Sequence, residues 1–520
     1  MTPGFPALAP RTAELPFSYR AMTVGGGVKA AATRGPGKIA VRFGEETRSY
    51  GELSDRIDRL AAAALGDLGL APGDRAAIIA RNRLEYIEIV CGLPEAGIAV
   101  ATVNARLTIG EIVAICDDVG AKVAFVDPGL AESLRAAQFA TVERIIAFGL
   151  EYESWLAETR ASTTLPRVEE WDVWTIPYTS GTTGKPKGVM VSHRSRVFNF
   201  AGMAATYGCF GPDDHFLALA PLNHGGGLGF TMAALFYGGS IEILDKFEPE
   251  TALRKLKFGG FTGIFMVPTH FQMIFELPQD VLDECRRPPL KTIISNAAPL
   301  PQAMKERIVP YFGETILHEC YGSTEGAVIA TLPPQHQLRK DRCVGLPFAC
   351  TEISIRNEAG DECAAGEIGE LFSRSPYLFN GYWNRPEETI QAYKDGWVSV
   401  GDMARRDDEG FLYIVDRKKD MVISGGVNIY PREIEEVLLH HPAIADVAVV
   451  GVPDERWGER LKVFAVVRGG LSLSADDIAN FCSGKLAPYK IPRELTLMDV
   501  LPRNTAGKIL KTDLRVPGIG

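Results

Sequence analysis

Several features that mark other protein classes are missing from this 520-residue sequence. No run of lysine and arginine is long enough to follow a phosphate backbone, and the net charge is −10 with a pI of about 5.5. Nucleic acid is therefore not an expected partner. The nine cysteines are scattered, odd in number and never spaced as C-x-x-C. This pattern argues against a disulfide framework or zinc site and favours a cytoplasmic location.

Membrane-targeting features are also missing. The N-terminus, Met1-Thr-Pro-Gly-Phe-Pro, has neither a basic segment nor an apolar segment of the kind found in signal peptides. No apolar run reaches the length of a transmembrane helix. We expect no transmembrane segment, while peripheral membrane contact and a homodimer stay open.

The length and the periodic pattern predict an α/β protein of more than one domain, because 520 residues exceed what one hydrophobic core supports. Residues 1–50 contain Pro and Gly clusters, including Val24-Gly-Gly-Gly-Val28, and are expected to be irregular. Helical spacing from Tyr50 to Leu70 is then followed by alternating strand-like and helix-like segments up to Asp127. Thr108 and Glu111 have the spacing of a capping box that begins one of these helices. Such alternation favours a largely parallel sheet with flanking helices.

A loop rich in Gly, Ser, Thr and Lys is the strongest functional signal: Tyr178-Thr-Ser-Gly-Thr-Thr-Gly-Lys-Pro-Lys-Gly188. It lies between two strand-like runs, residues 173–177 and 189–191, which disfavours a solvated linker. Hydroxyls, free backbone N–H groups and cations suit a polyphosphate, and Gly181, Gly184 and Gly188 are expected to take positive φ. The spacing differs from that of a Walker A loop. The candidate nucleotide-binding residues here are Thr179, Ser180, Gly181, Thr182, Thr183, Gly184 and Lys187.

A second signal is Glu319-Cys-Tyr-Gly-Ser-Thr-Glu-Gly326. Tyr321 offers a flat ring for purine stacking, and Glu325 offers one carboxylate to Mg²⁺, which is typically held by one or two carboxylates plus substrate phosphates. A hydrolase nucleophile motif is excluded, because Gly-x-Ser-x-Gly would require Gly at position 321. The candidate residues in this motif are Tyr321, Gly322 and Ser323 for the nucleotide, Thr324 for catalysis, and Glu325 for the metal and catalysis.

Three further stretches carry candidate site residues. His224, a candidate catalytic residue, follows a predicted strand and precedes Gly225 and Gly226, which suits a pocket wall or gate, although a lone His is often structural. Asp402 follows Gly401 at a turn and could accept hydrogen bonds from a ribose diol, although Asp is common in any turn. Small residues after the predicted strand at 292–295 could pack beneath a planar base or form a plain turn; they are Asn296, Ala297, Ala298 and Pro299.

The chain changes character where the apolar run from Phe411 meets the charged residues Arg417-Lys-Lys-Asp420. We therefore predict a large N-terminal domain over residues 1–416, a hinge at 417–420 and a small α+β domain over 421–520. The small domain should contain a helix from Pro431, strands near 445–452 and 462–467, and a helix from about Ser474. Its last motif, Leu501-Pro-Arg-Asn-Thr-Ala-Gly-Lys508, would by itself be a surface loop.

Taken in order, these motifs resemble the signature sequences of the adenylate-forming superfamily, which comprises acyl- and aryl-CoA ligases, luciferases and peptide synthetase adenylation domains. The resemblance spans residues 50–511. It implies a large domain of mixed sheets with flanking helices and a small mobile domain, with ATP, Mg²⁺ and coenzyme A as cofactor and co-substrates. It also implies roles for single residues: catalysis by Lys508, nucleotide contact by Arg417, a hinge at Lys419, a CoA tunnel along Gly425 and Gly426, and an acyl pocket at His224, Gly225, Gly226, Glu319 and Cys320.

Relatives often have Gly where this chain has Asn296, which would either add a hydrogen bond to adenine or narrow the acyl pocket. The implied reaction forms acyl-AMP from ATP and a carboxylate, and CoA then displaces AMP. The motif from His318 to Gly326 resembles fatty-acid ligases, so a medium- or long-chain aliphatic acid is the first expectation. An aryl acid, or transfer to a separate carrier protein, is the alternative. A non-catalytic nucleotide sensor would be expected to lack Lys508 or Glu325, and both are present.

Replacing Lys508 by Ala should abolish acyl-AMP formation while sparing the conversion of supplied acyl-AMP to the thioester. The reason is that this lysine would bridge the carboxylate and the α-phosphate only in the first half-reaction, before the small domain rotates. Separate assays of the two half-reactions test this. Equal loss of both would contradict a two-conformation mechanism.

Overall fold

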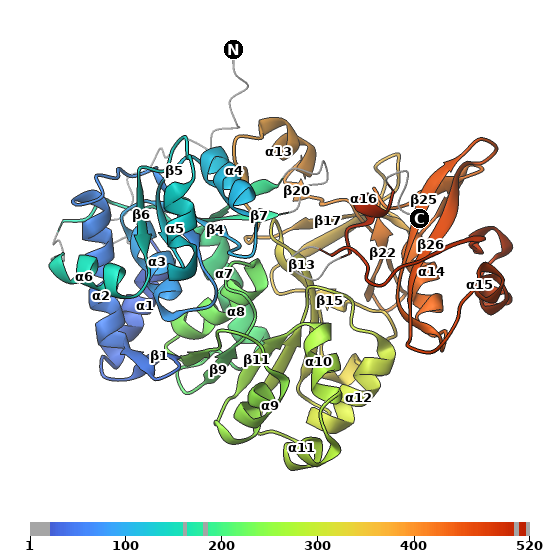
Figure 1. The fold of residues 1–520 in the computed structure, drawn as a ribbon, viewed down its shortest axis with the longest axis horizontal. Helices are drawn as coiled ribbons and strands as arrows, with labels where there is room; N and C mark the ends of the chain where they lie inside the picture. The colour runs from blue at the N-terminus through green and yellow to red at the C-terminus, as the bar shows by residue number, and fades with distance from the viewer. Residues whose placement is uncertain (1–20, 160–163, 180–185, 504–508, 516–520) are drawn as a thin grey trace.

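The computed structural model describes residues 21–159, 164–179, 186–503 and 509–515. Two large sheets with their helices and a smaller third sheet form the body of the molecule, and a fourth sheet with its helices forms a separate lobe at the C-terminal end (Figure 1). The arrangement confirms the predicted α/β class with a small C-terminal α+β unit. No helix among the described residues is long and apolar enough to span a bilayer.

The first large sheet has seven strands and is parallel except at β7/β8 and β8/β18. In spatial order its strands are β18 (Gly381–Tyr382), β8 (Lys187–Ser192), β7 (Val173–Thr179), β4 (Ala99–Val103), β3 (Arg75–Ile79), β5 (Ala121–Val126) and β6 (Arg144–Ala147). The helices of this part are α2 (Tyr50–Leu65), α3 (Leu84–Glu95), α4 (Ile109–Val119), α5 (Pro128–Ala136) and α6 (Leu150–Glu158). The predicted capping box is present at the start of α4, where Thr108 and Glu111 bond reciprocally.

The second large sheet has nine strands, and its central strands are parallel. In spatial order they are β15 (Leu346–Pro347), β14 (Ala327–Leu332), β13 (Leu317–Ser323), β12 (Thr292–Ser295), β11 (Gly263–Met266), β9 (His215–Ala218), β10 (Ser240–Ile243), β1 (Ile39–Phe43) and β2 (Glu46–Ser49). The associated helices are α1 (Val24–Arg34), α7 (His193–Tyr207), α8 (Gly225–Phe236), α9 (Pro249–Phe258), α10 (Pro268–Phe275), α11 (Gln279–Glu284), α12 (Gln302–Phe312) and the 3₁₀ turn Pro334–His336. One continuous core joins both large sheets through α1, α2, α3, α7 and α8.

The expectation that residues 1–50 are irregular is wrong for residues 24–49, which form α1, β1 and β2. Val24-Gly-Gly-Gly-Val28 lies inside α1 despite the low helix propensity of glycine. Tight packing explains the glycines: a Cβ on Gly25 would lie 2.6 Å from the carbonyl oxygen of Cys91, and one on Gly27 would lie 2.0 Å from the Phe236 ring. Tertiary contact therefore overrides local propensity here.

The third and fourth sheets are antiparallel apart from the β26/β27 pair. The third contains β19 (Tyr393–Lys394), β20 (Trp397–Val398), β17 (Gly369–Arg374), β21 (Asp402–Arg406), β22 (Leu412–Arg417) and β16 (Glu352–Arg356), with α13 (Pro386–Ala392) beside it. The fourth contains β24 (Val427–Ile429), β23 (Val422–Ser424), β26 (Gly458–Val467), β25 (Ile444–Asp454) and β27 (Glu494–Leu497). Its helices are α14 (Pro431–Leu438), α15 (Ala475–Cys482), α16 (Lys511–Leu514) and the 3₁₀ turn Pro488–Lys490.

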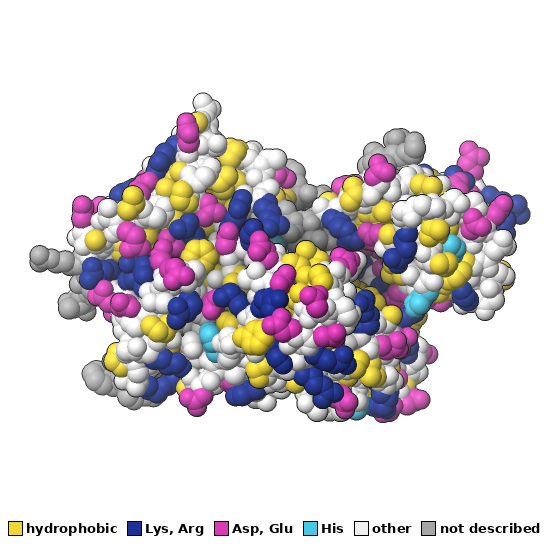
Figure 2. Space-filling model, turned by 60° about the horizontal axis from the view of Figure 1, so that its bottom comes forward, with side chains coloured by type: hydrophobic (Ala, Val, Ile, Leu, Met, Phe, Trp, Pro, Cys, Tyr) yellow, Lys and Arg dark blue, Asp and Glu magenta, His cyan; other side chains and the backbone are white. Residues whose placement is uncertain are grey.

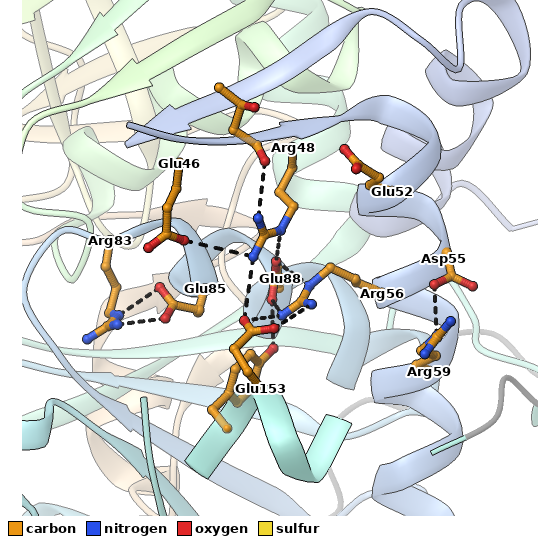
Figure 3. A network of polar contacts seen from close by, with 12 residues as sticks. Glu46, Arg48, Glu52, Asp55, Arg56, Arg59, Arg83, Glu85, Glu88 and Glu153 are labelled. Carbon is orange, nitrogen blue, oxygen red and sulfur yellow. Dashed lines mark hydrogen bonds and ion pairs between the residues drawn. The ribbon is translucent and has the colours of Figure 1, made fainter. Parts of the chain in front are cut away.

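A buried network of charges joins α2, α3 and α6 (Figure 3). The fully buried carboxylate of Glu88 accepts hydrogen bonds from Arg56 at 2.6 and 2.8 Å and from the hydroxyl of Tyr152 at 2.8 Å. Arg56 also donates to Glu153 at 2.7 and 2.9 Å. Because both partners are hydrogen-bonded, the cost of burying Glu88 is largely offset, and the network fixes the relative position of the three helices.

A buried histidine links the start of α1 to the start of α7. Nδ1 of His193 accepts a hydrogen bond from the backbone N–H of Val24 at 3.0 Å. Burial lowers the pKa of His193 from 6.5 to about 3, so the ring is neutral in the folded protein. The unfolded chain therefore binds a proton at this position that the folded chain excludes.

Stability should fall as the pH drops below about 6.5, because only the unfolded state gains the His193 proton between its ordinary pKa and the depressed one. At pH 5 this linkage amounts to about 2 kcal/mol. In His193→Asn, whose amide oxygen can still accept from Val24, the decrease in Tm between pH 7 and pH 5 should be smaller. An unchanged decrease would show that His193 is not a source of the acid sensitivity.

Candidate functional site

Strand β13 brings the predicted nucleotide residues of the second motif together with those of the third sheet. The hydroxyl of Tyr321 donates to the carboxylate of Asp402. The same carboxylate lies 3.3 Å from Nε of Arg417, which pairs with Asp402 across β21 and β22. Burial, and then the charge of Asp402, raise the pKa of Tyr321 well above its ordinary value. Tyr321, Asp402 and Arg417 thus form one cluster, as the ribose and purine assignments require.

Glu325 occupies the turn between β13 and β14, with 8% of its surface exposed. Its carboxylate accepts a hydrogen bond from the hydroxyl of Tyr382 at 2.8 Å. The guanidinium of Arg196, on α7, donates to the carbonyl of Thr324 at 3.1 Å. Burial lowers the pKa of Arg196 to about 10, and the charge of Glu325 opposes this shift. Nζ of Lys187 lies 5.2 Å from the centre of the Tyr382 ring.

Arg196 and Tyr382 are site residues that the sequence analysis missed. Tyr382 belongs to β18, which pairs with β8 directly after the phosphate-type loop. This pairing joins residues almost 200 positions apart, and no local sequence motif predicts it. Glu325 offers Mg²⁺ a hard oxygen donor beside the loop that would hold the phosphates, so the described residues fit this ion.

The strands on either side of the Gly/Ser/Thr-rich loop form an antiparallel pair in which Thr179 lies opposite Lys187. The loop residues Ser180, Gly181, Thr182, Thr183 and Gly184 lie outside the described residues, as does Lys508. In the neighbouring position of this strand pair, Tyr178 lies opposite Gly188, and the hydroxyl of Tyr178 donates to the carboxylate of Asp118 at 2.7 Å. The expected role of Gly188 is corrected: it lies in β8 without positive φ, and a Cβ there would be 2.8 Å from Ile176. Gly188 is small to permit strand packing.

His224 caps the N-terminus of α8, and the glycines that follow bring this helix close to the Glu325 turn. A Cβ on Gly225 would lie 4.0 Å from the hydroxyl of Thr324. Burial, with a smaller effect of Arg106, lowers the pKa of His224, so its ring is neutral at pH 7. Nε2 of His224 has no hydrogen-bond partner within the described part of the chain. A neutral ring with a spare nitrogen suits a pocket wall facing substrate.

The Asn296–Pro299 loop leaves β12 beside β13 in an unusual backbone conformation. Ala297 has φ +74°, and its N–H donates to the side-chain oxygen of Asn296 at 2.5 Å. Burial raises the pKa of the Cys320 thiol to about 12, opposed by hydrogen bonds with Tyr207 and Asn296. Asn296 is therefore in contact with Cys320, a predicted wall residue of the acyl pocket.

The expectation that Glu319 and Cys320 both line the acyl pocket is corrected for Glu319. Adjacent residues of a strand point to opposite faces of a sheet. Cys320 faces the core around Tyr207, whereas Glu319 faces α12, where its carboxylate lies 2.5 Å from Nζ of the buried Lys305. The other carboxylate oxygen of Glu319 accepts from the backbone N–H of Leu300 at 3.3 Å.

Residues of the predicted hinge lie between the last strand of the third sheet, β22, and the first strand of the fourth, β23. Lys419 is exposed at the surface, and partial desolvation lowers its pKa. Arg515, beyond α16, donates to the carbonyl of Lys419 at 3.4 Å and to Asp420 at 3.2 Å. Gly425 and Gly426 form the β23–β24 turn with φ of +58° and +80°. The domain limits and the hinge role stay predictions.

The antiparallel β7–β8 pair, the buried Glu325, the Tyr–Asp–Arg cluster and the separate C-terminal unit agree with the arrangement expected of an adenylate-forming enzyme. The chain belongs to the AMP-binding enzyme family, whose model matches residues 28–383, and residues 433–508 match the AMP-binding enzyme C-terminal domain. It is therefore an AMP-forming acid–thiol ligase that uses ATP, Mg²⁺ and CoA with a small carboxylate substrate.

The chain is also similar to individual proteins of this family. The chain is 36% identical to a 2-succinylbenzoate–CoA ligase of Geobacillus kaustophilus, over 94% of this chain and 96% of that protein. It is 34% identical to a feruloyl-CoA synthase of Amycolatopsis, over 93% and 96%. The ATP-bound crystal structure of MatB from Rhodopseudomonas palustris superimposes with a TM-score of 0.87 at 28% identity, covering 95% of this chain and 98% of MatB. Both sequence relatives are named for aromatic acids, and neither is named for the medium- or long-chain aliphatic acid of the first expectation.

Replacing Tyr382 by Phe should lower kcat/KM for MgATP about three- to tenfold, because the carboxylate of Glu325 loses one hydrogen bond that orients it. Acid-dependent ATP–pyrophosphate exchange at varied MgATP measures this.

The matched control is Tyr393→Phe. The hydroxyl of Tyr393 donates to the carbonyl of Phe379, and its ring stacks on Phe379, so the control removes a buried hydroxyl of the same region without touching Glu325. Equal losses in the two variants would refute the assigned role of Tyr382.

Proposed function

We propose that this protein is an aryl-acid–CoA ligase, which activates an aromatic carboxylic acid as its acyl adenylate and transfers the acyl group to CoA. The observation that carries the choice of acid is a continuous set of rings beside the predicted acyl pocket. The resemblance of the sequence to the aryl-acid relatives supports it.

The rings extend from α8 to β13. A Cβ on Gly226 would lie 3.1 Å from the ring of Phe265, and that ring centre is 4.8 Å from Phe230. Phe230 in turn lies 6.2 Å from Tyr207, which meets His318 edge-on at 5.2 Å. Rings at such distances pack on one another, and in this proposal a flat substrate ring would extend the set.

Polar atoms are interspersed among these rings. Nδ1 of His318 is buried without a hydrogen-bond partner among the described residues, and burial lowers the pKa of His318 to about 4. A neutral imidazole beside Cys320 and Tyr207 could bond to a hydroxyl, methoxy or second carboxyl group on a substrate ring. A long alkyl chain would leave these atoms unpaired, which disfavours an aliphatic acid.

The first half-reaction joins a carboxylate oxygen of the acid to the α-phosphorus of ATP and expels pyrophosphate. Lys187 and the neighbouring loop would bind the phosphates, Tyr321 would stack on the base and Asp402 would hold the ribose. Arg417 would contact the nucleotide, and Glu325 would hold the Mg²⁺ that offsets the charge of the leaving group. Lys508 would bridge the carboxylate and the α-phosphate. Catalysis in this step rests on positioning and charge stabilisation.

In the second half-reaction the CoA sulfur attacks the acyl carbonyl, the carbonyl–phosphate bond breaks and AMP leaves. Rotation about Lys419 would remove Lys508 and bring Gly425 and Gly426 to the same pocket, where the absence of side chains on the glycines would leave room for pantetheine. His224, Gly225 and Gly226 would form the wall between that path and the acyl pocket. Because His224 is partly buried and neutral, it would line the path without adding charge.

The test is acid-dependent ATP–pyrophosphate exchange with benzoate, cinnamate, ferulate, 2-succinylbenzoate and indoleacetate, in parallel with octanoate, palmitate and a steroid-like acid. We expect one or more aryl acids to give kcat/KM at least tenfold above every aliphatic acid, because flat rings match the aromatic wall. Free CoA should convert the best acids to thioesters.

Other outcomes would change the assignment. Exchange driven best by palmitate or octanoate would restore the aliphatic expectation. Exchange with an aryl acid but no thioester from free CoA would indicate a carrier protein as the acceptor.

A further inference from the structure

A buried ion pair lies directly behind the proposed nucleotide site, on the face of β13 that does not meet the acyl pocket. Nζ of Lys305, on α12, lies 2.5 Å from a carboxylate oxygen of Glu319, on β13. The side chain of Lys305 is fully buried, and that of Glu319 is 8% exposed. A lysine is seldom buried so deeply unless it is paired. The pair therefore holds the carboxylate of Glu319 in one place.

The second oxygen of this carboxylate reaches the Asn296–Pro299 loop. It accepts from the backbone N–H of Leu300 at 3.3 Å, immediately after Pro299. At the other end of the loop, the side chain of Asn296 acts on the thiol of Cys320, the residue next to Glu319, and lowers its pKa against the effect of burial. Two successive residues of β13, on opposite faces of the sheet, thus hold the two ends of one short loop.

The loop needs this restraint because its backbone is strained. Ala297 has φ +74°, a backbone conformation that residues other than glycine rarely adopt. Such conformations persist where surrounding contacts over-determine them, and they cluster at ligand sites. The hydrogen bond from Ala297 to Asn296 supplies one restraint, and the Glu319–Leu300 contact supplies another.

We propose that the Lys305–Glu319 ion pair is a positioning device for the nucleotide: it fixes the Asn296–Pro299 loop beneath the adenine and so sets the affinity for ATP, without touching the substrate acid. This proposal rests on the proposed function, because that function places the Asn296–Pro299 loop beneath the adenine base of ATP. Glu319 and Lys305 are positioning residues, and the geometry assigns to Glu319 a role different from the acyl-pocket role that the sequence suggested.

The experiment compares two double variants, because either single substitution leaves a buried charge without its partner. Lys305→Met with Glu319→Gln removes both charges but keeps a side-chain oxygen for Leu300. Lys305→Met with Glu319→Leu removes the charges and the oxygen together. Calorimetric titration with the non-hydrolysable analogue α,β-methylene-ATP measures nucleotide affinity without any acid, and exchange assays give KM for ATP and for the acid.

We expect the Met/Leu variant to weaken analogue binding and raise KM for ATP about five- to tenfold, with KM for the acid changed less than twofold. The Met/Gln variant should show a smaller rise, since the acceptor for Leu300 is kept. The control is Arg56→Met with Glu88→Gln, which removes the buried ion pair between α2 and α3, distant in sequence from the Asn296–Pro299 loop. This control should lower Tm and leave both KM values unchanged.

Two results would overturn the proposal: folded double variants that bind the analogue as tightly as the unmodified protein, or a rise in both KM values together that the control reproduces. The binding arm separates this test from that of the proposed function. If no acid drives exchange, the ligase assignment fails, yet the change in analogue affinity still decides whether the pair positions the loop.

Discussion

The alternation of side chains along β13 is the constraint on which the site depends. Glu319 points to α12, Cys320 points to the core beneath α7 and α8, and Tyr321 reaches across to Asp402 on the third sheet. Three successive residues therefore tie together a helix, a pocket wall and a second sheet. Because a strand side chain cannot change face without a register shift, a displacement of β13 would disturb the Asn296–Pro299 loop, the core around Cys320 and the Tyr321–Asp402–Arg417 cluster together.

Charges at the site are buried with partners already in place. Arg196 and Tyr382 bond to the Thr324–Glu325 turn. On the surface, the face drawn in Figure 2 shows basic and acidic side chains interspersed without a broad patch of one sign. Affinity for an anionic nucleotide thus comes from a local arrangement within an acidic protein. Groups held in advance in a site of low dielectric lose little free energy to reorganisation when charge develops, which is what phosphoryl chemistry requires.

Much of the fold and of the nucleotide site could be predicted from the sequence, because those signals are local. The strand and helix periods, the Thr108 capping box and the order of the motifs each depend on residues close together in the chain. The acid was harder to predict, because the rings on which the proposed aryl specificity rests, Tyr207, Phe230, Phe265 and His318, belong to four separate elements. Only His318 belongs to a recognised motif, and that motif does not show which residues of other elements lie beside it, so resemblance around His318 alone pointed to an aliphatic acid.

The sequence by itself determined the chemistry: hydroxyls and glycines before Gly188, a carboxylate at Glu325 and a lysine at 508, in an order that specifies adenylate formation. Only the tertiary structure decided which faces these residues share. It turned Glu319 away from the acyl pocket toward Lys305, made Gly25 and Gly27 part of a helix and brought Tyr382 to Glu325. The reason is physical: reactivity is carried by single side chains and short loops, whereas burial, partner choice and pocket shape arise from contacts between segments distant in the chain, whose free energies outweigh local propensity.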